Sequence, residues 1–169
     1  MTPCPASADG ANLERAVLVL GIGNTLLGDE GAGVHAMRRL EASCGSRPGV
    51  DFVDGGTLSF TLAGLIESSA AIIVLDAAQM RAAPGSVAVF EGEHMDEFLG
   101  SERKRSVHEV SLLDLMALAA LGGRLPVRRA LIGIQPQAID WADAPTETVA
   151  QAIPRACERA RELIERWRS

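Results

Sequence analysis

AVLVLGIGNTLLGDEGAG, residues 16–33, joins an unbroken apolar run to a glycine-rich segment. The run Ala16–Leu20 is typical of a strand that is covered on both faces of a parallel sheet. Gly21–Gly33 then turns the chain off the strand, and a helix is predicted over Val34–Ala42. The segment therefore predicts a strand-loop-helix unit, with Asp29 and Glu30 at the entrance of the helix.

Strand and helix patterns alternate along the rest of the chain. Further strands are predicted over Val50–Asp54, Ala71–Asp76, Ser86–Glu91 and Arg129–Ile134, and helices over Phe60–Glu67, His94–Leu99, Ser111–Leu121 and Thr146–Trp167. The last helix carries an apolar stripe that is expected to pack on the sheet, formed by Val149, Ile153, Cys157, Ala160, Ile164 and Trp167.

This order predicts an α/β fold, a single three-layer α/β/α sandwich around a mostly parallel five-stranded sheet. Residues 1–13 are expected to form a flexible lead-in, and residues 14–169 the single domain. The short turn at Pro84-Gly85 favours a hairpin, so Ser86–Glu91 is expected to run antiparallel to the strand before it.

Composition excludes several classes of protein. The formal net charge of −6 argues against binding to nucleic acid through its phosphates. No apolar run is long enough to span a membrane, and the N-terminal residues lack the pattern of a signal peptide, which predicts a cytoplasmic protein. The three cysteines are widely spaced and form no C-x-x-C pair. Neither a disulfide framework nor a zinc site built from cysteines is therefore expected.

Carboxylates follow three of the predicted strands. Glu30, Asp54 and Asp76 come after the first, second and third strands, and in such sheets ligands bind beyond the carboxyl ends of the strands. Plain structural roles compete with function at each position: Glu30 as an acid that favours the positive end of a helix, Asp76 as a turn cap, and Asp54-Gly55-Gly56 as a tight turn.

A dinucleotide site is the first alternative for the glycine-rich loop. Gly21-Ile22-Gly23 begins the usual fingerprint, but Leu26 stands where the third glycine belongs. Asp29 and Glu30 also place negative charge where a pyrophosphate would bind. A metal fits better, because Glu30, Asp76 and the loop residue His108 form a set of two carboxylates and one imidazole that suits nickel or zinc.

Several segments together resemble the nickel–iron hydrogenase maturation endopeptidases. They are GIGNTLLGDEGAG at Gly21–Gly33, then Asp54-Gly55-Gly56-Thr57, Leu75-Asp76-Ala77, Ser106-Val107-His108-Glu109 and Ile132-Gly133-Ile134-Gln135-Pro136. The resemblance runs from about Ala16 to Trp167. It implies an endopeptidase that removes the C-terminal extension of the hydrogenase large-subunit precursor after nickel has been inserted.

The resemblance also implies the roles of the site residues. Glu30, Asp76 and His108 are expected to be the catalytic, metal-binding set, and Asp54, Gly55 and Gly56 to bind substrate. The nickel is expected to come with the substrate, although other divalent metals could replace it, and the partner is the large-subunit precursor. The metal's part stays open between polarising the scissile carbonyl, activating water and only reporting that nickel is present. The rival functions are a nucleotide- or phosphate-binding domain and a non-catalytic hydrogenase assembly chaperone.

Overall fold

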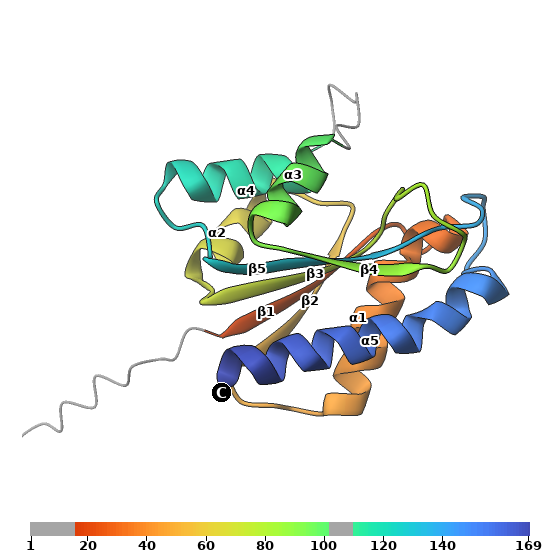
Figure 1. Ribbon diagram of the computed structural model, residues 1–169, viewed down its shortest axis with the longest axis horizontal. Coiled ribbons are helices and arrows are strands. Elements are labelled where there is room, and N and C mark those ends of the chain that lie inside the picture. The colour runs from red at the N-terminus through yellow and green to blue at the C-terminus, as the bar shows by residue number, and fades with distance from the viewer. Residues whose placement is uncertain (1–15, 102–109) are drawn as a thin grey trace, which may run out of the picture.

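The computed structural model describes residues 16–101 and 110–169, and its strands form one five-stranded sheet in the order β2-β1-β3-β5-β4 (Figure 1). The strands are β1 (Val17–Ile22), β2 (Val50–Gly56), β3 (Ala71–Ala77), β4 (Val87–Glu91) and β5 (Arg128–Ile134). The helices are α1 (Ala32–Cys44), α2 (Ala63–Ser68), α3 (Glu93–Ser101), α4 (Leu112–Leu121) and α5 (Glu147–Arg168), with short 3-10 helices η1 (Gly28–Gly31) and η2 (Phe60–Leu62). The predicted fold class is confirmed.

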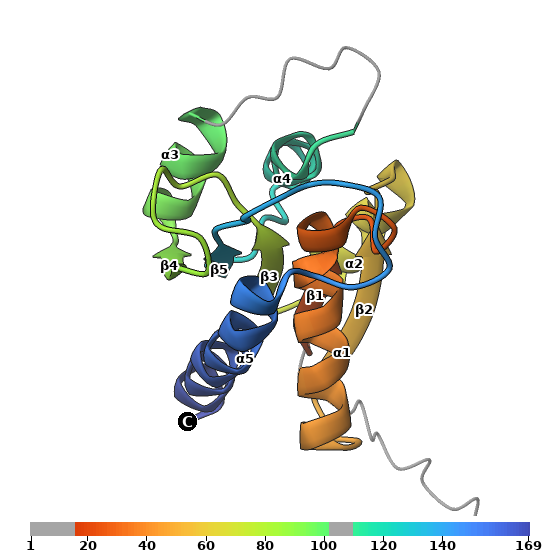
Figure 2. The same ribbon diagram turned by 90° about the vertical axis from the view of Figure 1, so that its right-hand side faces the viewer.

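The helices lie on both faces of the sheet, as the alternating buried side chains of its strands require (Figures 1 and 2). On one face, Val17 and Val19 of β1 belong to a core cluster that α1 and α5 complete. On the other face, Leu18 and Leu20 belong to a second cluster, which α2, α3 and α4 cover. The predicted apolar stripe of α5 is confirmed, because five of its six residues are buried and Trp167 packs against them.

The strand order corrects one detail of the sequence analysis. β4 does run antiparallel, but its hydrogen-bonded neighbour is β5, with Val87 opposite Ile134, and not β3. β5 lies between β3 and β4, so no hairpin joins those two strands. The connection after β3 is long enough to cross β5, and Gly85 N–H donates to the carbonyl of Gln135 beyond the end of that strand at 2.8 Å.

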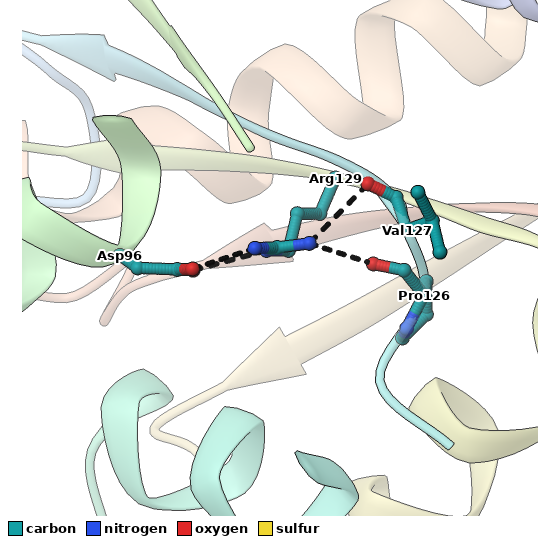
Figure 3. Close-up of polar contacts among 4 residues, drawn as sticks. All are labelled: Asp96, Pro126, Val127 and Arg129. Carbon is teal, nitrogen blue, oxygen red and sulfur yellow. Dashed lines mark hydrogen bonds and ion pairs between the residues drawn. The ribbon is translucent and has the colours of Figure 1, made fainter. Parts of the chain in front are cut away.

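A half-buried ion pair fastens α3 to the sheet (Figure 3). Nε and Nη2 of Arg129, on β5, donate to the two carboxylate oxygens of Asp96, on α3, at 3.0 and 2.6 Å. Nη1 donates to the carbonyls of Pro126 and Val127, both at 3.3 Å. Hydrogen bonding to Asp96 raises the pKa of Arg129, and this bidentate contact holds the edge of the sheet under α3.

Two further sequence predictions concern the N-terminal residues and membrane-spanning segments. Residues 1–13, the predicted lead-in, lie outside the described residues. Among the described residues, no helix combines the length and the apolar character needed to cross a bilayer.

Replacement of Gly33 by alanine is expected to destabilise the fold by about 3 kcal/mol or more. A Cβ at this position would lie 2.1 Å from the carbonyl oxygen of Leu75 and 2.5 Å from that of Ile22, so α1 would have to move off the sheet. Urea denaturation measures the change in the free energy of unfolding.

Gly64→Ala is the matched control. Gly64 is also helical, but a Cβ there meets nothing within 4 Å. Alanine should therefore be neutral or stabilise by roughly 0.5–1 kcal/mol. Equal stability of the Gly33→Ala and wild-type proteins would contradict the close packing of α1 on the strand ends.

Candidate functional site

The carboxyl ends of β1, β2, β3 and β5 meet at one edge of the sheet, because these four strands are parallel. In register, Gly21 of β1 lies between Asp54 of β2 and Leu75 of β3. The chain leaves β1 through α1 toward β2 and leaves β2 through α2 toward β3, on opposite faces of the sheet. The strand order thus reverses between β1 and β3, which is where ligands bind in open α/β sheets.

Glycines bring the loop after β1 into close contact with this edge. Gly23 has a φ of 131°, and a Cβ there would lie 1.8 Å from the carbonyl oxygen of Glu30. Gly33 rests in the same way on the carbonyl of Leu75, the residue before Asp76. Only glycine allows the loop to fold back so tightly. The glycines therefore set the position of Glu30 relative to the end of β3.

Asp29 is fully buried and holds a distant loop in place. One carboxylate oxygen accepts hydrogen bonds from the backbone N–H groups of Gln137 and Ala138 at 2.8 and 2.9 Å, and the other from the N–H of Thr146 at 2.6 Å. Burial alone would raise the pKa of Asp29, but these three backbone donors, with the Thr146 hydroxyl, lower it. Asp29 therefore remains ionised, and its role is to hold the loop between β5 and α5 in place.

Glu30 differs from its neighbour although both acids stand in η1, at the entrance of α1. Its side chain is partly exposed, and its carboxylate has no hydrogen-bond or ion-pair partner among the residues that the structure describes. Because it lies at the strand edge and the structure gives it no internal role, Glu30 is the carboxylate available for a ligand.

Asp76 is the penultimate residue of β3 and is half-buried. It follows Ile72 and Val74 at the spacing of one sheet face, and both of those side chains belong to the cluster that includes Leu112 and Leu115 of α4. Asp76 therefore stands at the strand edge on the face that α4 covers.

The Asp54-Gly55-Gly56 segment ends β2 with a β-bulge and not with the tight turn considered from the sequence: Gly21 pairs with Asp54 and Ile22 with Gly56, so Gly55 is the extra residue. One carboxylate oxygen of Asp54 accepts the Gly56 N–H at 2.9 Å, and the other pairs with Arg38 at 2.9 Å in an exposed contact. Gly56 has a φ of 46°, and a Cβ on Gly55 would lie 2.8 Å from the Leu20 side chain. The bulged strand end thus accounts for these residues structurally, and substrate binding by them stays a prediction.

The predicted metal set cannot be assembled from the described residues. Glu30 and Asp76 lie at the ends of neighbouring strands, whereas His108 lies outside the described residues. Within residues 16–101 and 110–169, no group of three His, Cys, Asp or Glu side chains is placed to hold a metal ion. The three-residue set therefore stays a prediction.

Gln135 has a structural role that the sequence did not reveal. Its buried side chain accepts the Met80 N–H at 2.7 Å and also contacts the side-chain oxygen of Gln79. Its backbone N–H donates to the carbonyl of Ser86 at 2.9 Å. Gln135 thereby ties the connection between β3 and β4 to the end of β5. Its place directly after a predicted strand was the only signal in the sequence.

Two other titratable residues, His35 on α1 and Cys157 on α5, are half-buried and buried respectively. Burial lowers the pKa of His35, and the nearby positive charge of Arg38 lowers it further. The imidazole is therefore neutral at pH 7. Its buried Nε2 has no hydrogen-bond partner among the described residues. Burial raises the pKa of Cys157, whose thiol donates to the carbonyl of Ala36 at 3.3 Å. The Cys157 thiol is therefore part of the core and is no nucleophile.

A cavity of about 690 Å³ lies away from this edge. It is formed by the first residues of β1 and β2 and by the last residues of α1 and α2 with the loops that follow them. Neither Glu30, Asp54 nor Asp76 lines it. The cavity therefore does not belong to the candidate site.

Comparison with known proteins assigns the chain to a class of enzyme. The family model described as "Hydrogenase maturation protease" matches residues 34–163. The chain is 32% identical over 152 residues to the hydrogenase expression/formation protein HoxM of Cupriavidus necator, which covers 89% of this chain and 75% of that protein. It is 31% identical over 144 residues to the hydrogenase 2 maturation protease of Escherichia coli, covering 85% and 87% of the two chains.

Solved structures agree with this assignment. The hydrogenase maturating endopeptidase HybD from Escherichia coli superposes with a TM-score of 0.77 at 29% identity, covering 86% of this chain and 89% of that one. A maturation protease HybD from Thermococcus kodakarensis superposes with a TM-score of 0.69 at 31% identity, covering 88% and 99%. The chain therefore belongs to the hydrogenase maturation protease family and is a peptidase of that family.

Asp29→Asn is expected to lower the free energy of unfolding at pH 7 by about 2–3 kcal/mol, because an amide would turn an N–H₂ group toward backbone donors that now bind a carboxylate. The lowered pKa fixes the pH dependence. The stabilisation by Asp29 is fully present above its unfolded pKa of about 3.9 and is lost as the pH falls through the folded pKa. Denaturant titrations at several pH values measure both effects.

Asp143→Asn is the control for this prediction. Asp143 is exposed in the same loop, and its replacement should change stability by less than about 0.5 kcal/mol. If Asp29→Asn were as mild as Asp143→Asn, the buried carboxylate would not be what holds the loop.

Proposed function

We propose that this peptidase removes the C-terminal extension of the nickel–iron hydrogenase large-subunit precursor after nickel has been inserted. Family membership and relatives that are themselves named maturation proteases support this substrate. The observation that carries the proposal furthest is the contrast between two adjacent acids. Asp29 is buried and satisfied, whereas Glu30 is partly exposed at the strand edge and has no partner among the described residues.

In the proposal, Glu30, Asp76 and His108 bind the nickel that the precursor carries. Glu30 and Asp76 follow neighbouring parallel strands, at the point where the strand order reverses. α4, which begins shortly after His108 in sequence, covers the sheet face on which Asp76 stands. Two carboxylates and an imidazole suit nickel, and other divalent ions of similar preference could replace it.

Three protein ligands leave the remaining positions on the metal to the substrate. The site would then be completed only when the precursor brings its own nickel, which explains how cutting can wait for nickel insertion. A metal in this position supplies positive charge that stabilises the charge developing on the scissile carbonyl. Asp54, Gly55 and Gly56 belong to the same edge and are proposed to bind the substrate chain.

The decisive experiment incubates the purified protein with nickel-loaded and nickel-free precursor and follows the mass of the precursor. We expect a C-terminal peptide to be lost only from the loaded form. Glu30→Gln and Asp76→Asn should each slow this loss by at least about 100-fold, because each variant loses a charged ligand of the nickel, whose positive charge would stabilise the charge developing on the scissile carbonyl. The exposed acid Asp51 provides the control, and Asp51→Asn should process at the wild-type rate.

The outcomes separate this function from its two rivals. Unchanged processing by Glu30→Gln would exclude the proposed role of Glu30. Binding of the precursor without any cutting would favour an assembly chaperone. A rise in melting temperature with a dinucleotide would favour a nucleotide-binding domain, although the acids in η1 oppose it.

Metal analysis of the protein as purified gives an independent test. We expect much less than one equivalent of nickel, since the ligands come from separate loops and the shell needs the substrate. A full equivalent that survives dialysis would contradict a site completed by the precursor.

A further inference from the structure

Large apolar side chains stand exposed beside Glu30. Leu26, Ile139 and Trp141, which we name the apolar rim, are 58%, 53% and 82% exposed. Their backbones adjoin, because Leu27 and Ala142 form a parallel bridge and the Ala142 N–H donates to the carbonyl of Leu26 at 3.0 Å. Leu26 and Trp141 directly precede the two bridged residues. The rim therefore joins the loop after β1 to the loop after β5.

The rim is fixed to the loop that carries Glu30. Asp29 binds the backbone of Ala138 on one side of the rim and that of Thr146 on the other. A Cβ on Gly28 would lie 3.3 Å from the carbonyl oxygen of Asp140, between the two rim residues of this loop. In Figure 2 the blue segment between β5 and α5 crosses over the start of α1. Surfaces held in advance bind without the entropic cost of ordering a loop.

The two loops that form the rim carry charge of one sign. Residues 16–37 and 130–154 contain no lysine or arginine. They contain Glu30 and the exposed acids Asp140, Asp143 and Glu147. A partner that covers this surface must therefore bring apolar side chains together with basic ones.

From these observations we infer that the apolar rim docks the nickel-loaded large-subunit precursor through a surface that combines apolar side chains with lysine or arginine. This inference rests on the proposed function, since it identifies the partner as the substrate. Docking on the rim places the partner next to Glu30, because Glu30 follows Asp29 directly. Exposed aromatic side chains held by a rigid frame are typical of residues that contribute most to binding.

The test by kinetics compares Trp141→Ala with Leu121→Ala. Leu121 is 86% exposed at the end of α4 and serves as the matched apolar control. Trp141→Ala should raise the KM for nickel-loaded precursor by about tenfold or more and leave kcat within about twofold, as expected for an anchor that binds substrate and transition state alike. Leu121→Ala should change neither value, and both variants should keep the wild-type melting temperature.

Charge gives a second readout from the same surface. The double variant Asp140→Asn, Asp143→Asn should raise KM at low salt and flatten its dependence on salt. An unchanged salt dependence would overturn the basic character assigned to the partner.

A third measurement does not depend on cutting. The chain has two tryptophans, Trp141 on the rim and Trp167 packed against the core. With 5-fluorotryptophan in this protein and unlabelled nickel-loaded precursor, the ¹⁹F signal of Trp141 should shift and that of Trp167 should not. Trp167→Phe assigns the two signals, and the Glu30→Gln variant prevents turnover during the measurement.

The outcomes distinguish the rim from the proposed function. If the Trp141 signal shifts but the wild-type protein does not cut the precursor, the proposed function would be wrong and the docking surface would stand. Normal cutting by wild-type protein with an unmoved Trp141 signal, or with equal KM for Trp141→Ala and Leu121→Ala, would overturn the rim and keep the proposed function.

Discussion

The buried carboxylate of Asp29 joins two loops that lie far apart in the sequence, and the candidate site depends on that junction. Its oxygens accept backbone N–H groups from Gln137, Ala138 and Thr146, while the acid itself sits in η1 between β1 and α1. Buried charge is stable only when it is fully hydrogen-bonded, and here three backbone donors and a hydroxyl meet that need. Glu30, the next residue, is partly exposed.

Much of the fold could be predicted, because apolar runs of strand length and stripes of helical spacing depend on local sequence. Each predicted strand and helix over the described residues is present, with ends that differ by a few residues. The neighbours of β4 could not be predicted in this way. A turn signal at Pro84-Gly85 does not reveal that β5, more than 40 residues later, inserts beside β3 and takes β4 as its own partner.

The candidate site, too, could be predicted from the sequence only in part. The strand ends predicted that Glu30, Asp54 and Asp76 share one edge; the structure has Asp54 and Asp76 near the carboxyl ends of β2 and β3, and Glu30 in η1 between β1 and α1. The resemblance singled out Glu30, but the residues alone could not separate Asp29 from Glu30, because the burial of Asp29 is decided by donors from another loop. Nor could the sequence reveal that Asp54 accepts the Gly56 N–H at the bulged end of its own strand. His108 lies outside the described residues, so its place with the carboxylates rests on motif alone.

The contact between Asp29 and Thr146 also has a consequence for the order of events during synthesis. Its two partners are separated by 117 positions in the chain. Long-range contacts form only after the intervening segment has been made, so a nascent chain cannot position the loop that carries Ile139 and Trp141. The junction at Asp29, and with it the placement of the loop that carries Ile139 and Trp141, can therefore form only after Thr146 has been synthesised.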